Sequence, residues 1–166
     1  MYETKRLYYE DVYKKEFTAR VLECRSRKKG YEVILDETAF YPEGGGQPSD
    51  MGTLDGIAVT EVQEKEGELL HYTVAPLEVG KYVAGKIDWE RRFDLMQQHS
   101  GEHIVSGLIH EAFGYENVGF HMGSDVITVD FSGAFARSRW LKLKRRLMAS
   151  YGKMLQWRSF THQRRS

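Results

Sequence analysis

The sequence predicts an α+β protein, in which a small N-terminal β-barrel with a glycine-rich loop precedes a second α+β lobe. Short alternating or apolar segments, separated by turn-forming residues, fill the first half of the chain and favour a small barrel or meander. After Asp88, apolar residues recur at helical spacing, and the strand-like sequence VITVDF follows at 126–131. A helix followed by a strand, apart from the barrel, indicates an α+β lobe.

Residues 1–88 contain the segments expected to build the barrel. Two of them, 17–24 and 31–36, flank the turn-rich sequence SRKKG and are expected to form a hairpin. The glycines and prolines of FYPEGGGQPSDMG, at 40–52, predict a loop. Three further short strands are expected, separated by KEGE and PLEVGK: 56–63, 69–74 and 82–87.

A long helix is expected over Trp89–Phe113, at the start of a second domain that spans 89–133. Asp88 is a typical N-cap residue, and Gly114 is typical of the position just after a helix. Five apolar residues follow a roughly helical period between them: Phe93, Met96, Ile104, Leu108 and Ala112.

The composition indicates a globular protein without disulfides. Of the 166 residues, 41% are hydrophobic and 13% aromatic, enough to bury a sizeable core. Cys24 is the single cysteine, which excludes an internal disulfide and a cysteine-rich zinc finger within this chain. The first residues contain no apolar signal-peptide core, and no apolar run reaches membrane-spanning length, so we expect a cytoplasmic protein without membrane contact.

Charge is divided unevenly along the chain. Residues 134–166 contain ten Lys and Arg but none of the 24 Asp and Glu. Trp140, Leu143, Leu147, Tyr151 and Leu155 fit a basic amphipathic helix that could bind RNA phosphates. The other interpretation is a shift of reading frame that replaced the native continuation, and the complete absence of acidic residues favours it.

The sequence QQHSGEHI contains a histidine pair suited to a metal ion. His99 and His103 are four residues apart, so both imidazoles project from one helical face. A zinc ion held by such nitrogens can lower the pKa of water to about 7. Gly101 and Gly107 each cost a helix about 1 kcal/mol relative to alanine, which suggests a close approach to the backbone. The alternative is a surface or core pair without function.

His99, Glu102 and His103 also satisfy the H-x-x-E-H pattern of inverted zinc metallopeptidases. Such an enzyme needs a further acidic ligand well downstream, and no acidic residue follows Asp130. A glutamate on an exposed helix face is the more ordinary interpretation of Glu102. We therefore rank the peptidase below the other hypotheses.

Two distant motifs together resemble the alanyl-tRNA editing family, the free-standing relatives of the editing domain of alanyl-tRNA synthetase. They are TAFYPEGGGQPSDMG at 38–52 and, about fifty residues later, QQHSGEHIVSGLIHEAFG at 97–114. The resemblance covers roughly residues 1–133. It implies a glycine-rich barrel domain that helps to seat tRNA, followed by a zinc-containing domain that deacylates tRNA(Ala) mischarged with serine or glycine.

The resemblance also implies the roles of individual residues. His99 and His103 would be ligands of Zn²⁺, with Glu102 as a candidate catalytic residue. The family's substrate-facing position after the helix falls near Phe120 and His121. The full set of expected substrate-binding residues is His121, Gln98, Gly44, Gly45, Gly46 and Gln47. Mischarged alanine tRNA is the expected partner, a homodimer is also considered, and ATP binding is considered as a further property that the family resemblance could imply.

One departure from the family leaves two functions open. The family completes its metal site with a Cys-x-x-x-His pair further along, but no cysteine follows Cys24. A site of two histidines and waters would hold zinc more weakly. The leading hypothesis is therefore a metal-assisted aminoacyl-tRNA deacylase, and the alternative is a tRNA-binding module without catalysis.

Overall fold

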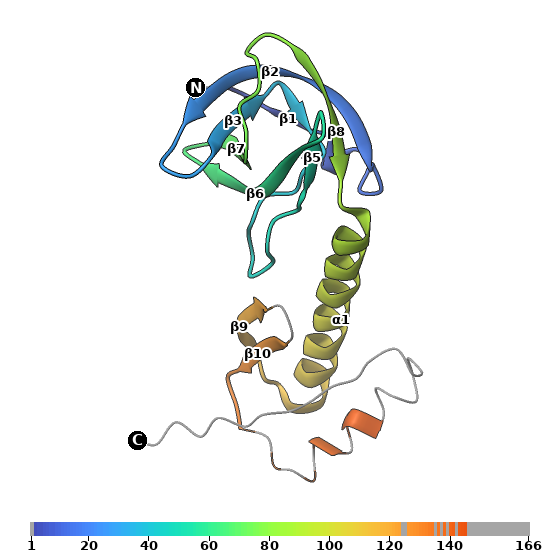
Figure 1. Cartoon of the computed structure of the whole chain (residues 1–166). Helices are drawn as coiled ribbons and strands as arrows, with labels where there is room; N and C mark the ends of the chain where they lie inside the picture. The colour runs from blue at the N-terminus through green and yellow to red at the C-terminus, as the bar shows by residue number, and fades with distance from the viewer. Residues whose placement is uncertain are drawn as a thin grey trace.

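The computed structural model describes residues 2–123 and 126–134, together with 136, 138, 140, 141 and 143–145. Mostly antiparallel strands fold above one long helix, as Figure 1 shows, so the predicted α+β class is confirmed. Leu147, Tyr151 and Leu155, which the sequence placed on a basic helix, lie outside the described residues. No helix in the described part of the chain is long and apolar enough to cross a membrane.

Six antiparallel strands pair in a closed barrel in the order β2-β3-β7-β6-β5-β8. Their bounds are β2 Glu16–Ser26, β3 Tyr31–Leu35, β5 Gly52–Leu54, β6 Ile57–Lys65, β7 Glu68–Thr73 and β8 Tyr82–Ile87. The barrel interior contains fully buried Val21, Val33, Leu35, Phe40 and Leu54. Outside the barrel, β1 Lys5–Arg6 pairs in parallel with β4 Glu37–Thr38, and the 3-10 helix η1 Leu7–Tyr9 follows β1.

The sequence did not predict β5 as a strand. Asp55 and Gly56 both have positive φ angles, 48° and 78°, and connect β5 to β6 as a two-residue hairpin turn. An Asp-Gly pair between alternating segments is the usual signal of such a turn. Gly52, expected in the loop, therefore belongs to the sheet, where it pairs with Val59 and Ile87.

Helix α1, Trp89–Phe113, follows directly from β8 and has the predicted bounds (Figure 1). The Asp88 carboxylate accepts a hydrogen bond from the Arg91 amide at 3.2 Å. At the other end Gly114 adopts φ 69°, and its amide donates to His110 O at 2.7 Å. Both caps satisfy backbone groups that a helix end leaves unpaired, which explains why local sequence sets these bounds.

Beyond α1, strands β9 Asn117–Met122 and β10 Ile127–Phe131 form an antiparallel hairpin beside the helix (Figure 1). His121, expected in a loop, lies within β9, because NVGFHM pairs with the predicted VITVDF segment. The second half of α1 packs through Val105 and Ile109 against Phe131, Trp140 and Leu143. Leu143 is 3% exposed, so at least this residue of the basic segment contributes to the second core.

A buried ion pair fixes α1 to the rest of the chain. The Arg92 guanidinium donates to the Asp50 carboxylate, with Nε 2.8 Å from Oδ1 and a second contact through Nη2. Arg92 also donates to Val12 O at 3.1 Å and to Ala39 O at 2.6 Å. Both side chains are almost fully buried, which is tolerable because nearly every charged atom has a hydrogen-bond partner. Helix, glycine loop and N-terminal segment therefore meet at one residue.

The glycine loop also contacts β9 directly. The Met122 amide donates to Gly46 O at 3.0 Å. Gly46 has φ 80°, and a Cβ there would lie 2.3 Å from Phe120 O. Only glycine allows this approach, since any side chain would strike the backbone of the neighbouring strand.

Inside the barrel, His71 is fully buried and neutral. Its Nδ1–H donates to Val33 O at 3.1 Å, so Nε2 accepts from the Thr38 hydroxyl at 2.8 Å. Burial lowers the pKa of His71 from 6.5 to about 4, because no acidic partner compensates the lost hydration of its cation.

We expect protonation of His71 to destabilise the fold in acid. Between pH 6.5 and about 4 the unfolded chain binds a proton that the folded chain resists. The contribution of neutral His71 to the free energy of unfolding is therefore fully present above pH 6.5. It falls with decreasing pH by up to about 1.4 kcal/mol per pH unit. Urea unfolding from pH 7 to 4 measures the slope, and NMR titration assigns it. A His71 resonance that titrates near pH 6.5 would refute the explanation.

Substitution of Gly46 should be more damaging than substitution of its neighbour. Gly46→Ala must push the loop from Phe120 and break the bond to Met122, which costs about 1–3 kcal/mol. Gly45→Ala is the matched control, since Gly45 has a similar φ of 59° but nothing within 4 Å of a new Cβ. Urea denaturation of both variants compares the costs, and equal losses would mean that the contact with Phe120 contributes nothing.

Candidate active site

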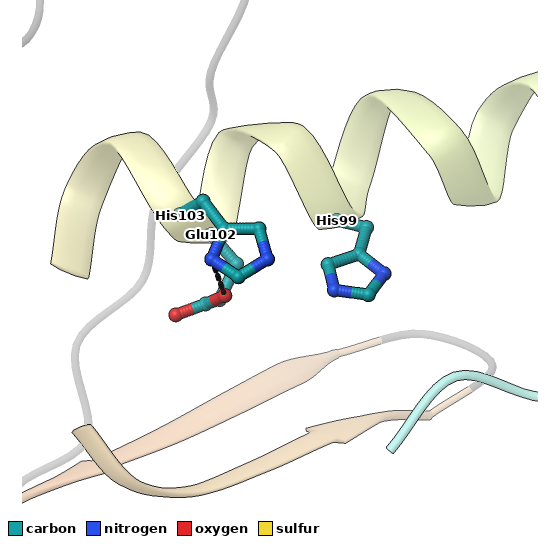
Figure 2. Close-up of side chains that lie close together, drawn as sticks. All are labelled: His99, Glu102 and His103. Atoms are coloured by element: carbon teal, nitrogen blue, oxygen red, sulfur yellow. Dashed lines mark ion pairs between the residues drawn. The ribbon is translucent and has the colours of Figure 1, made fainter. Parts of the chain in front are cut away.

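The predicted histidine pair lies on the side of α1 that faces the β9–β10 hairpin (Figure 2). The imidazole rings of His99 and His103 stack, with centroids 4.9 Å apart and planes at 21°. One potential ligand atom from each of His99, Glu102 and His103 lies within 4.8 Å of the others. His99 is partly buried, His103 is exposed, and Glu102 is buried.

The barrel supplies the hydrogen-bond partner of His99. Gln47, 52 residues earlier and 7% exposed, places its amide oxygen 2.6 Å from His99 Nδ1. An amide oxygen only accepts, so Nδ1 carries the proton and Nε2 retains its lone pair. Two predicted site residues from different lobes are thus brought into direct contact.

Glu102 holds the corresponding position beside His103, with Oε2 3.4 Å from His103 Nδ1 (Figure 2). Its other oxygen accepts from Asn117 Nδ2 at 2.7 Å and from the Ser106 hydroxyl. Glu102 is 1% exposed, so the expectation of a glutamate on an exposed helix face is wrong. The donors from Ser106 and Asn117 offset the loss of hydration and make burial possible.

Such an arrangement fits a divalent metal ion. Both histidines direct Nδ1 to an oxygen, which leaves each Nε2 available, and metal-binding histidines characteristically have such a second partner. Imidazole nitrogens suit zinc and neighbouring transition metals. Among the described residues no other histidine or cysteine joins this group.

The structure places the other predicted residues in different surroundings. Gly46 abuts Phe120, whose ring lies 5.4 Å from that of His99. Gly44 and Gln47 exchange backbone hydrogen bonds of 3.1 and 3.0 Å, which close the loop tip, while Gly45 has open space around it. The Gln98 amide donates to Asp94, and Gln98 does not line the pocket beside the histidines. His121 is exposed on β9 and outside the metal-ligand group.

A pocket of about 310 Å³ opens beside the histidines. Its wall joins the N-terminal segment, the glycine loop and α1 through Tyr8, Val12, Tyr41, Gln47, Arg92, Met96, His99, Ser100 and His103. That volume suits a small ligand. Sequence reasoning missed six of these residues, and no motif marks Tyr8 or Val12. The helical spacing of Met96, Ser100 and His103 is the signal that could have identified part of the wall.

Comparisons with known proteins agree with the predicted family. The profile of the class II (A) tRNA synthetases matches residues 2–91. The alanyl-tRNA editing protein Aarsd1 of Bos taurus is 35% identical over 159 residues, covering 82% of this chain and 36% of its own length. The alanyl-tRNA editing protein AlaX-M of Pyrococcus horikoshii is 44% identical over 117 residues, covering 69% and 52%.

An alanine–tRNA ligase of Halobacterium salinarum is also similar, 41% identical over 139 residues, covering 77% of this chain and 15% of the ligase. This chain thus spans between about a seventh and a half of the length of these relatives. The similarity includes proteins named for alanyl-tRNA editing from a mammal and an archaeon, and it agrees with the two motifs found in the sequence. The chain belongs to the alanyl-tRNA editing family.

Proposed function

We propose that the chain contributes to hydrolysis of the aminoacyl ester of tRNA(Ala) mischarged with serine or glycine. The observation that carries the proposal is the oriented histidine pair, with the Nδ1 atom of His99 donating to Gln47 and that of His103 beside Glu102. The editing names of the relatives support the same reaction class. A second hydrolytic site is useful because a synthetase pocket discriminates poorly between near-isosteric amino acids.

The residues present can each contribute a defined step. His99 and His103 would hold a divalent ion, which we propose to be zinc; when bound, it supplies Lewis acidity to the ester and lowers the pKa of water. Gln47 fixes the ring of His99 through its hydrogen bond. Glu102 fixes His103 in the same way, so we assign it a positioning role. An activated ester then needs no nucleophilic side chain.

Burial of Glu102 also argues against the metallopeptidase hypothesis. A general base must reach the substrate or its water. The carboxylate is 1% exposed and already accepts from Asn117 and Ser106. The binding module without catalysis stays an alternative, because the metal-ligand group among the described residues has only three members.

Loss of either histidine should abolish deacylation. We expect His99→Ala and His103→Ala to release serine from Ser-tRNA(Ala) at least about 100-fold more slowly than the unsubstituted chain. His110→Ala is the matched control, since His110 is an exposed histidine of the same helix that contacts Glu116 at 3.1 Å, outside the site. Unchanged activity in His99→Ala, with the unsubstituted chain clearly above background, would refute the assignment.

A measurement of zinc affinity tests the proposed metal site without any measurement of deacylation. Glu102→Gln should weaken zinc binding about 10- to 100-fold in a titration of the full chain, because His103 loses its charged partner. The hydrogen bonds that Ser106 and Asn117 donate to Glu102 can partly remain in this variant, because the amide oxygen of glutamine also accepts. Less than about a tenth of an ion per chain in the unsubstituted protein, with RNA binding retained, would instead favour the binding module.

A further inference from the structure

An aromatic surface extends the pocket along the first half of α1. Trp89, Phe93, Met96, Ser100 and His103 recur at alternating intervals of four and three residues, so they share one face of the helix. The last three line the pocket, while Trp89 and Phe93 lie beyond it. Every side chain in this series is exposed or partly exposed. The face therefore leads continuously from two aromatic rings to a predicted metal ligand.

Further rings widen this surface. Trp89 stacks on Phe93 at 5.8 Å and 28°, and Tyr13 lies 5.8 Å from Trp89. At the pocket itself, Tyr8 contacts Tyr41 and Tyr9, each at a centroid distance of 4.8 Å. Four of these rings are 37–71% exposed: Tyr9, Tyr13, Tyr41 and Phe93. We call these four residues, with partly exposed Trp89, the aromatic platform. Tyr8 is only 2% exposed and packs against two of the platform rings.

We propose that the aromatic platform binds the unpaired nucleotides at the 3′ end of the aminoacylated RNA by stacking on their bases. The inference rests on the proposed function, since the ester to be cleaved is attached to the terminal nucleotide. Single-stranded RNA is commonly held by aromatic side chains on which successive bases stack. The platform adjoins the pocket that contains His99 and His103, where that terminal nucleotide must lie.

The dimensions agree with this occupant. Phe93 and His103 are ten residues apart, or about 15 Å along the helix axis. At roughly 3.4 Å for each stacked base, this distance accommodates about four nucleotides. The unpaired end of a tRNA is of this length, so its last base would reach the pocket while the first of the four lies on Phe93.

The charges around the platform favour stacking over phosphate contacts as the source of affinity. Lys15 Nζ lies 4.6 Å from the centre of the Trp89 ring, and Arg91 donates to Ser49 O at 3.4 Å. Exposed Glu90 and Asp94 lie on the same stretch of helix and balance these cations. Double-stranded RNA, whose bases are not accessible for stacking, should therefore bind weakly to this surface.

Binding of uncharged RNA tests the proposal separately from hydrolysis. A fluorescein-labelled single-stranded RNA ending in ACCA is titrated into the full chain and followed by anisotropy. High salt is used because the ten basic residues of 134–166 attract any RNA. Phe93→Leu removes the ring face but retains an apolar side chain, and we expect it to weaken binding about 10-fold. Tyr41→Ala should act similarly.

Tyr82→Ala is the matched control, since Tyr82 is a 68% exposed ring at the end of β8 furthest from α1. It should leave affinity unchanged, and a duplex of the same length should not compete. Equal affinity of Phe93→Leu and Tyr82→Ala, or equal competition by the duplex, would overturn the proposal. So would a dimer that Phe93→Leu dissociates without a change in RNA affinity, since the rings would then form a protein interface.

The RNA-binding measurement can be interpreted whether or not the chain is a deacylase. Weak binding in Phe93→Leu, with no release of serine by the unsubstituted chain, would retain the platform and reject the proposed hydrolysis. Normal release of serine with the same Michaelis constant in both Phe93→Leu and Tyr82→Ala would retain the hydrolysis and reject the platform.

Discussion

The buried contact between Arg92 and Asp50 is the constraint on which the site depends. Asp50 ends the glycine loop three residues after Gln47, and Arg92 lies two helical turns before His99, about 10 Å along the axis. Because the guanidinium also binds Val12 O and Ala39 O, it sets three segments relative to one another. The 2.6 Å bond between Gln47 and His99 follows from that placement. An ion pair of this kind contributes geometry more surely than net stability.

A second attachment, between the glycine loop and β9, completes the frame. Gly46 contacts Phe120 and Met122 through its backbone, while the Phe120 ring faces His99. The loop is thus held at its end by Asp50 and near its tip by β9. Gln47 lies between these attachments, which limits the freedom of its side chain. Gln47 is also one of the nine residues that line the pocket. The rigidity of the glycine loop and the shape of the pocket therefore both depend on the backbone around Gln47.

The sequence was sufficient to predict those elements whose limits are set by contacts between neighbouring residues. The bounds of α1 could be predicted because Asp88 and Gly114 act within one turn of the helix ends. Glu102 was misjudged, since its burial depends on Asn117, fifteen residues later and in a strand that was not predicted. Gly119 weakened the strand pattern of β9, which pairs with β10 in the register Ile127 to Met122. The contact of Gln47 with His99 joins residues 52 apart, and no periodic pattern records such a pairing.

The division of the site between two lobes has an evolutionary consequence. The ring of His99 is oriented by an amide from the barrel loop, and its neighbour His103 by a carboxylate on the helix that carries them both. Recombination that replaced the barrel with one lacking a glutamine at position 47 would preserve both imidazoles but remove the hydrogen bond that orients His99. The barrel loop and the histidine helix are therefore coupled through one side-chain contact, even though each lobe has its own hydrophobic core.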